Sequence, residues 1–170
     1  YFNDVRRFGW MRVIKQSELE RIIQNIGPDP LKITSEDFYR ILHQSKKPIK
    51  LLLTDQEKLG GVGNIYANEA LFGARIIPGT PANKLTEKKS KLLLESLKKF
   101  LKKGIKLGGA SDNNYRDAYG EKGEMQEHFL VYGREGENCF NKCGSKIKRI
   151  KQGGRSSFYC PRCQMSDIIA

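Results

Sequence analysis

Hydrophobic residues recur at helical spacing in three stretches of the chain. In the first stretch the apolar positions are Leu19, Ile22, Ile23 and Ile26. A repeat of three and four residues lines up such side chains along one face of a helix. Ser17 and Glu20 have the spacing of a capping box, and Gly27-Pro28 ends the pattern. We therefore predict a first helix that begins at Ser17.

The second and third stretches predict two more helices. Thr34 or Ser35 can cap the second helix, whose inward residues are Phe38, Ile41 and Leu42. The third helix should run from Thr86 to about Lys106, with an apolar stripe made of Leu93, Leu97, Phe100, Leu101 and Ile105. The lysines on its other face are most simply a solvated surface.

A glycine-rich turn, "GGVGN", lies between these helices. Glycines at 60, 61 and 63 disfavour a helix interior, whereas Ile65 to Ala74 is helical in pattern, with Asn64 as its cap. A short helix at "LLLT" precedes the turn. The start of a helix offers N–H groups and a positive dipole end to an anion such as phosphate. A tight turn without a ligand is the alternative.

The remaining segments contain fewer hydrophobic residues and no helical repeat. The opening "YFNDVRRFGWMRV" favours a strand or a pair of strands, and residues 108–123 form a long polar loop. Near the end, "KIKRIKQGGRSSFY" predicts two strands around a Gly153-Gly154 turn. The fold class is therefore mainly α, a helical bundle followed by a β-hairpin.

All cysteines flank this hairpin, in two close pairs. Cys139 and Cys143 are spaced C-x3-C, and Cys160 and Cys163 are spaced C-x2-C. A hairpin with such a pair at each end brings four sulfurs into a tetrahedron, the geometry that zinc prefers. A complete four-cysteine shell leaves no open position, so we expect one structural zinc ion. Two disulfides or four free thiols are the alternative, and neither His43 nor His128 is required as a ligand.

The net charge of +12 comes from 31 Lys and Arg against 19 Asp and Glu. Such a charge suits a polyanion or an anionic membrane, although it can also serve only for solubility. No apolar run approaches the roughly 20 residues of a membrane span, and no signal segment opens the chain. We expect an intracellular protein. Arg155, between two glycines and two serines at the hairpin tip, suits phosphate oxygens or is a solvated arginine.

Three stretches, "GGVGNIYANEALF", "QEHFLVYGREGENC" and "GGRSSFYCPRCQ", together with "DVRRFG", resemble the bacterial formamidopyrimidine-DNA glycosylase family. The resemblance implies a helix–two-turn–helix domain over residues 17–107 and a zinc finger over residues 134–170. Residues 1–16 would end an N-terminal β-rich domain that the 170 residues lack, and residues 108–133 would form the damaged-base loop and a linker. It also implies a cytoplasmic, nucleoid-associated monomer that acts on damaged double-stranded DNA.

The resemblance assigns DNA-binding roles to individual residues. Asn64 and Gly63 of "GVGN" and Arg155 of "GGRSS" match contacts to the phosphates that flank the lesion. The other matching positions are Lys46 and Tyr132 as backbone contacts, Arg7 as a DNA-contacting arginine, and Arg6 and Phe8 as the wedge that fills the hole left by a flipped base. Arg155 is also assigned proton donation in the late elimination step. A guanidinium is a poor acid, which favours the phosphate role.

The chain departs from the family pattern in two places. Its first cysteine pair is C-x3-C where the family usually has C-x2-C. The family's nucleophile, an N-terminal proline followed by glutamate, has no counterpart here, since Tyr1 is not proline and Pro28 is internal. We expect the intact protein to remove oxidised purines (8-oxoguanine and formamidopyrimidines) as a glycosylase and abasic-site lyase. The 170 residues alone should bind DNA without cutting it. A non-catalytic zinc-finger nucleic-acid-binding module, or a structural interaction protein, is the alternative.

Overall fold

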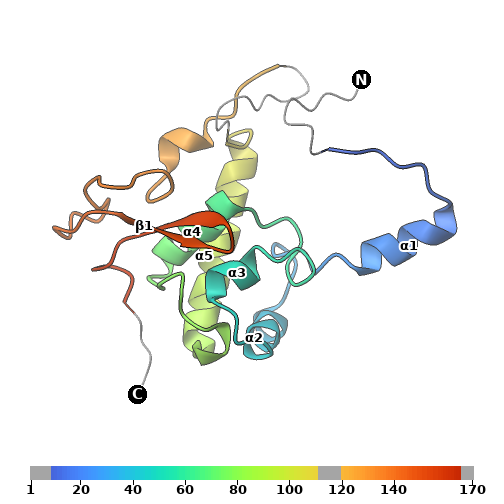
Figure 1. The fold of residues 1–170 in the computed structure, drawn as a ribbon, viewed down its shortest axis with the longest axis horizontal. Coiled ribbons are helices and arrows are strands. Elements are labelled where there is room, and N and C mark those ends of the chain that lie inside the picture. The colour runs from blue at the N-terminus through green and yellow to red at the C-terminus, as the bar shows by residue number, and fades with distance from the viewer. Residues whose placement is uncertain (1–8, 111–119, 166–170) are drawn as a thin grey trace.

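The computed structural model describes residues 9–110 and 120–165. Its helices and strands follow one another as shown in Figure 1: α1 (Gln16–Gln24), α2 (Ser35–His43), α3 (Ile49–Leu53), α4 (Asn64–Gly73), η1 (Ala82–Lys84), α5 (Glu87–Lys106), η2 (Met125–His128), β1 (Lys148–Gln152) and β2 (Arg155–Tyr159). The predicted fold class, mainly α with a terminal hairpin, is confirmed.

Helices α2 to α5 enclose the main hydrophobic core. Thr34 caps α2 by accepting a hydrogen bond from the Asp37 N–H, and Thr86 caps α5 in the same way through Lys89. Phe38 of α2 and Leu97 of α5 are fully buried, together with apolar residues of α3 and α4. Thr34 is thus the cap of the two alternatives predicted for α2, and most of the predicted core residues are buried. Ile105, predicted to belong to the α5 stripe, is instead 71% exposed.

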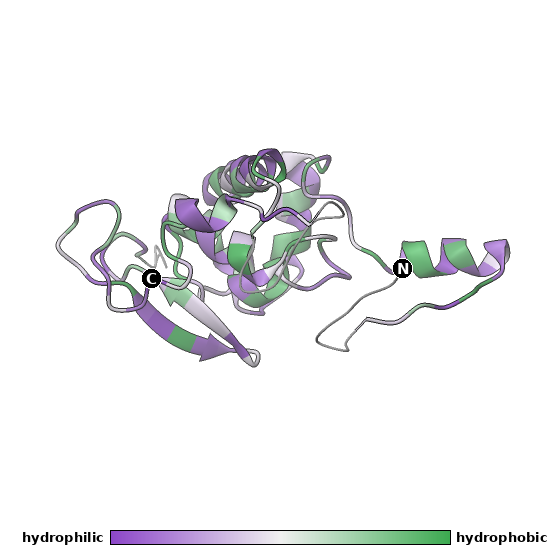
Figure 2. Cartoon of the chain, turned by 90° about the horizontal axis from the view of Figure 1, so that it is seen from above, coloured by the Kyte–Doolittle hydropathy of each residue, from purple (hydrophilic) through white to green (hydrophobic). Residues whose placement is uncertain are grey.

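Helix α1 forms but does not join the core. It begins at Gln16, and the Glu18 carboxylate accepts the Lys15 backbone N–H at 3.2 Å, so the predicted Ser17 and Glu20 capping box is wrong. Figures 1 and 2 show α1 extending away from the other helices. No residue of α1 is buried, and Ile23 is 54% exposed. The helix is therefore present as the periodicity predicts, but its apolar face is largely exposed.

The N-terminal segment does not show the expected strand in its described part. Residues 9–13 have no strand pairing, and the rest of that prediction lies outside the described residues. Trp10 and Val13 are highly exposed. No helix in the described part of the chain is both long enough and apolar enough to cross a membrane.

The two strands form an antiparallel hairpin whose register places Gln152 opposite Arg155. Gly153 and Gly154 have φ angles of +54° and +76°, which a two-residue type I′ turn requires. Around the hairpin lies a second, smaller core that consists of Phe72, Val131, Cys139, Ile147, Phe158 and Cys160. Phe72 belongs to α4, so the hairpin and the helical unit share this core.

Candidate nucleic-acid interface and metal centre

The start of α4 lies against the hairpin. The Asn64 side-chain Nδ2 donates to the Ser156 carbonyl of β2 at 3.2 Å. Gly63 occupies the N-cap position, and Asn64 is the first helical residue, so the prediction that Asn64 caps the helix is wrong. The residue instead uses its amide to connect two segments that are 92 positions apart.

The glycine-rich turn before α4 is ordered by Gln56. Its Nε2 donates to the Val62 carbonyl at 2.9 Å, and its Oε1 accepts the Gly61 N–H at 2.9 Å. The Gly60 N–H donates to the Pro28 carbonyl. The turn itself offers few free amides to an anion, because the N–H groups of Gly60 and Gly61 already have partners. Any anion site here depends on the helix start and on neighbouring side chains.

Helix α3 contributes a lysine that the sequence reasoning missed. Lys50 is fully buried, and its Nζ has no hydrogen-bond partner among the described residues. Burial, and to a smaller extent the nearby positive charge of Arg155, lower the pKa of Lys50 to about 8. A lysine inside the apolar run "PIKLLL" was the signal that could have identified it.

The hairpin tip also contacts α3. A Cβ placed on Gly153 would lie 2.8 Å from Leu51 Cδ2, so the glycine allows the turn to approach this helix closely. Gln152 Oε1 and Asn64 Oδ1 are buried and have no partner in the described part of the chain. We call Lys50, Asn64, Gln152 and Arg155 the tip cluster. It combines two positive charges with amide groups and contains no carboxylate.

Tyr132 is held in place by a buried carboxylate on α4. Glu69 accepts the backbone N–H groups of Leu130, Val131 and Tyr132 at 2.9, 3.0 and 2.8 Å. Burial raises the pKa of Glu69, and the three N–H donors oppose that shift. The Tyr132 ring also makes an edge contact with Phe158 at 5.2 Å between ring centroids. Sequence reasoning missed Glu69 because its three partners lie more than 60 positions away.

Among the described residues, the predicted backbone contact Lys46 is not part of the tip cluster, whereas Arg155 belongs to it. Lys46 is exposed in the loop between α2 and α3. Arg6, Arg7 and Phe8 lie outside the described residues, as does most of the predicted damaged-base loop. Arg155 is exposed at the start of β2, next to the turn.

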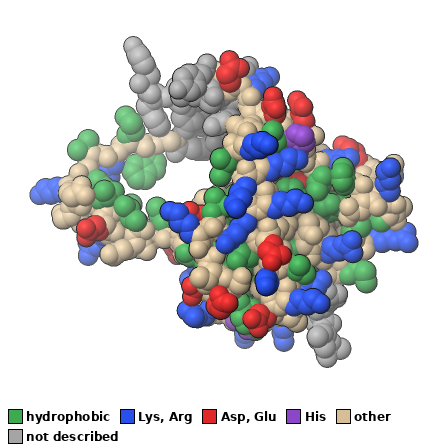
Figure 3. Space-filling model, turned by 180° about the vertical axis from the view of Figure 1, so that it is seen from behind, with side chains coloured by type: hydrophobic (Ala, Val, Ile, Leu, Met, Phe, Trp, Pro, Cys, Tyr) green, Lys and Arg blue, Asp and Glu red, His purple; other side chains and the backbone are tan. Residues whose placement is uncertain are grey.

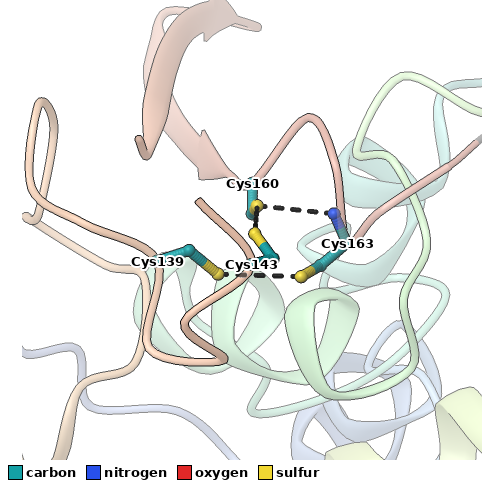
Figure 4. A group of neighbouring side chains, drawn as sticks. All are labelled: Cys139, Cys143, Cys160 and Cys163. Atoms are coloured by element: carbon teal, nitrogen blue, oxygen red, sulfur yellow. Dashed lines mark hydrogen bonds between the residues drawn. The ribbon is translucent and has the colours of Figure 1, made fainter. Parts of the chain in front are cut away.

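The four cysteine sulfurs gather at the base of the hairpin (Figure 4). All four lie within 4.8 Å of one another, with 3.7 Å between the sulfurs of Cys139 and Cys163 and 3.5 Å between those of Cys143 and Cys160. Zinc–sulfur bonds of about 2.3 Å in a tetrahedron require sulfur separations of about 3.8 Å. The four cysteines are free of disulfides and fit one structural zinc ion.

The longer first cysteine loop keeps this geometry through two left-handed residues. Lys142 and Gly144 have φ angles of +50° and +80°. The Lys142 N–H donates to the Cys139 carbonyl at 2.9 Å, which closes the loop over the additional residue. Burial raises the pKa of the Cys139 thiol to about 12, so a bound zinc ion would be what favours its thiolate form.

Hydrogen bonds of Gln164 connect the second cysteine pair to the segment after α4. Gln164 Oε1 accepts the Cys160 N–H at 2.8 Å, and its Nε2 donates to the Ile76 carbonyl at 2.8 Å. Asn68 similarly accepts the Phe158 N–H at 2.7 Å. Helix α4 and its continuation thus hold the hairpin at several points.

A helical unit joined to a β-hairpin with four cysteines at its base defines a zinc-finger protein of the helix–two-turn–helix class. Residues 26–115 match the model of the formamidopyrimidine-DNA glycosylase H2TH domain. Residues 141–164 match the zinc finger found in FPG and IleRS. Because the first match covers more than half of the chain, the protein belongs to the formamidopyrimidine-DNA glycosylase H2TH domain family.

Individual relatives carry the same name. The chain is 42% identical over 167 residues to formamidopyrimidine-DNA glycosylase of Chloroflexus aurantiacus, covering 97% of this chain and 60% of that protein. It is 41% identical over 170 residues to the Thermus thermophilus protein, covering 96% of this chain and 63% of that protein. The chain thus spans about three fifths of the length of these relatives.

Solved structures agree with this relationship. The MutM (Fpg) protein of Thermus thermophilus superposes with a TM-score of 0.88 at 41% identity, covering 96% of this chain and 64% of that one. Fpg of Lactococcus lactis, in a complex with DNA that contains an abasic site, gives a TM-score of 0.86 at 39% identity, covering 96% and 61%.

Proposed function

We propose that this chain is the DNA-binding part of a glycosylase and abasic-site lyase that removes oxidised purines, 8-oxoguanine and formamidopyrimidines, from duplex DNA. The observation that carries the proposal is the tip cluster, where a rigid arginine-bearing turn, a buried lysine and the start of a helix converge. Its positive charge and amide groups suit phosphate oxygens. The abasic-site DNA bound to the Lactococcus lactis relative supports the same substrate class.

In this proposal the tip cluster binds the phosphate backbone of the DNA. The Arg155 guanidinium at the exposed tip can bind a phosphate through two parallel hydrogen bonds, and the Lys50 amine adds a second charge behind it. Asn64, Gly63 and the first N–H groups of α4 take an adjacent phosphate at the positive end of the helix. Lys46 and Tyr132 contact further backbone positions along the DNA strand. None of these contacts depends on a base edge, so binding is not specific for sequence.

Binding of the DNA backbone by the tip cluster requires a rigid hairpin, which a zinc ion would provide. When bound by Cys139, Cys143, Cys160 and Cys163, the ion fixes the base of the hairpin and therefore the direction in which Arg155 projects. Glu69 and Asn68 fix the same assembly from the helical side. The four-sulfur shell leaves the metal no open coordination position, so the ion's role is structural.

The chemistry of the intact protein requires a nucleophile that these 170 residues do not contain. In the family the chain resembles, an N-terminal proline attacks the sugar and forms an imine. Arg6 and Phe8 would fill the gap left by a flipped base, Arg7 would contact the DNA, and Arg155 would assist the late elimination step. The isolated chain should bind a damaged duplex as a monomer without releasing a base. In the cell the intact protein would act at the bacterial nucleoid.

A binding assay with a duplex that contains an abasic-site analogue tests this proposal. We expect Asn64→Ala and Arg155→Ala each to weaken binding about tenfold on every sequence tested, because both residues act on phosphate. Arg149→Ala is the matched control, since Arg149 lies on the same hairpin but pairs with Glu135 at 2.9 Å. Equal affinity for the wild type and both tip variants would contradict the proposal.

A further inference from the structure

A groove of about 370 Å³ lies between the middle of α5, the C-terminal end of α4 and the first cysteine loop. Its floor includes Phe72 and Phe100, which are almost completely buried. Two large apolar side chains stand exposed at its edge, Leu92 at 42% and Phe140 at 58%. Phe140 lies in the C-x3-C loop, so the lengthened loop supplies one wall. The groove therefore offers apolar contact surface that the hydrophobic core leaves uncovered.

Positive charge surrounds this apolar surface. Arg75 and Lys99 line the groove, and both are exposed. The helical repeat of 3.6 residues places further lysines of α5 on the same side of the helix, exposed except for the half-buried Lys103: Lys88, Lys91, Lys102, Lys103 and Lys106. Within the described part of the chain, no ion pair neutralises any of these lysines. Figure 3 shows Lys and Arg side chains gathered along the middle of this face.

One carboxylate, Glu95, lies among the lining residues. It stands between Lys91 and Lys99, four positions from each along the helix, so lysines adjoin it on both sides. The surroundings of the groove therefore remain positive, and an acidic ligand would meet more attraction than repulsion.

The groove is separate from the tip cluster. Asn64 begins α4, whereas Phe72 and Gly73 end it, and nine residues of helix span about 14 Å. Phe140 lies beside the cysteines, at the end of the hairpin opposite the Gly153-Gly154 turn. Phosphate contacts at the tip and contacts in the groove thus involve different surfaces.

We propose that this groove binds a short segment of a partner protein in which acidic residues adjoin a bulky apolar side chain. The apolar side chain packs between Leu92 and Phe140, and the carboxylates pair with Arg75, Lys99 and the lysines of α5. A DNA backbone would satisfy the charges but would offer nothing to the two exposed apolar side chains. Chemical complementarity therefore favours an acidic peptide over a second nucleic-acid segment.

A fluorescent ten-residue probe peptide with five Asp, one Phe, one Leu and three Gly tests the proposal on the full 170-residue chain with zinc present. Leu92→Ser and Phe140→Ser should each weaken probe binding about five- to tenfold, and Lys99→Glu by at least as much. Because Phe140 adjoins a cysteine, Leu92→Ser provides an independent test if the Phe140 variant folds poorly. Ile105→Ser and Lys84→Glu are matched controls, exposed and outside the groove, and should bind the probe like the wild type.

A second probe, with Phe and Leu both replaced by Ser, separates apolar recognition from general charge attraction. We expect it to bind at least tenfold more weakly than the first probe. Equal binding of the two probes would overturn the proposal, and so would a Leu92→Ser variant that retains full affinity. The proposal also fails if Leu92→Ser and Phe140→Ser weaken duplex DNA binding instead, since the groove would then be a nucleic-acid surface.

Discussion

Lys50 of α3 places an ammonium group near Arg155 of the hairpin tip, where it has no hydrogen-bond partner in the described part of the chain. Burying a charged amine without a partner destabilises a fold, and its pKa of about 8 reflects that cost. A residue that weakens the fold in this way is a candidate for function, because a bound phosphate would provide the missing partner. The free-energy cost of burying the Lys50 charge therefore arises at the position where a phosphate would bind.

Lys50→Met should therefore have opposite effects on stability and on binding. Removing the buried amine is expected to raise the free energy of unfolding by about 1–2 kcal/mol at pH 7, while DNA affinity falls about tenfold. Urea denaturation and a duplex binding assay measure the two quantities. Lys47→Met is the control, since Lys47 is exposed and pairs with Asp55 at 3.0 Å. A variant that loses stability and keeps its DNA affinity would show that Lys50 is a structural residue.

The lowered pKa of Lys50 also predicts a pH dependence. In the folded protein the amine loses its proton near pH 8, whereas in the unfolded chain it keeps it up to about pH 10.5. The unfolded state therefore binds more protons between these values, so this residue's contribution to stability increases from pH 8 to 10.5. Wild-type affinity for DNA should decrease between pH 7 and 9 as the charge is lost. Titrating binding across this range should show a weaker decrease in Lys50→Met.

Sequence patterns identified some of these residues but not their partners. Arg155 and Asn64 were predicted from glycine turns and from the family resemblance. Glu69 and Lys50 were not, because a buried carboxylate or amine is recognisable only when distant segments meet around it. Asn64 was assigned to the cap from its place before a helix, whereas the fold uses its side chain to reach Ser156.

At the scale of elements, α4 connects the two hydrophobic cores. Its Leu71 belongs to the main core and its Phe72 to the core of the hairpin. Asn68 and Glu69, which precede Leu71 in the same helix, accept backbone N–H groups of Phe158 and of the segment before the finger. These contacts hold the zinc hairpin against the helical unit by packing and hydrogen bonds.

Zinc removal should consequently affect α4 as well as the hairpin. We expect a chelator to abolish amide protection in β1 and β2 and to reduce it at the C-terminal end of α4, while α2 and α5 stay protected. Hydrogen exchange measured residue by residue distinguishes these regions. Re-adding zinc is the control and should restore protection. Unchanged exchange in β1 and β2 after complete metal loss would contradict a structural role for the ion.

The helices and strands that were predicted most closely are those with the strongest local sequence patterns. Helices α2 and α5 combine periodicity with a threonine cap, and the hairpin has a glycine pair at its turn, so all three were predicted closely. Helix α1 was predicted too, but its start was wrong and its exposed apolar face was unexpected. Periodicity indicates that a face is apolar, not which element covers it. The short η1 and η2 helices have too few residues for any repeat.

At the scale of the whole molecule, the chain spans about three fifths of the relatives it matches. Binding and chemistry should therefore be separable in this polypeptide. The 170 residues should bind an abasic-site duplex, yet borohydride should trap no covalent adduct with it, because no N-terminal proline is present to form the imine. Full-length Thermus thermophilus MutM is the positive control. An adduct with the 170-residue chain would show that one of its lysines acts as the nucleophile.

The central claim is that the hairpin tip binds DNA through phosphate, and salt dependence tests this most directly. Affinity for an abasic-site duplex should be measured between 50 and 300 mM salt for the wild type, Arg155→Ala and Arg149→Ala. Each phosphate contact contributes about 0.9 to the slope of log affinity against log salt concentration. We predict that Arg155→Ala lowers the magnitude of this slope by about one, while Arg149→Ala leaves it at the wild-type value. Identical slopes for all three proteins would contradict the account.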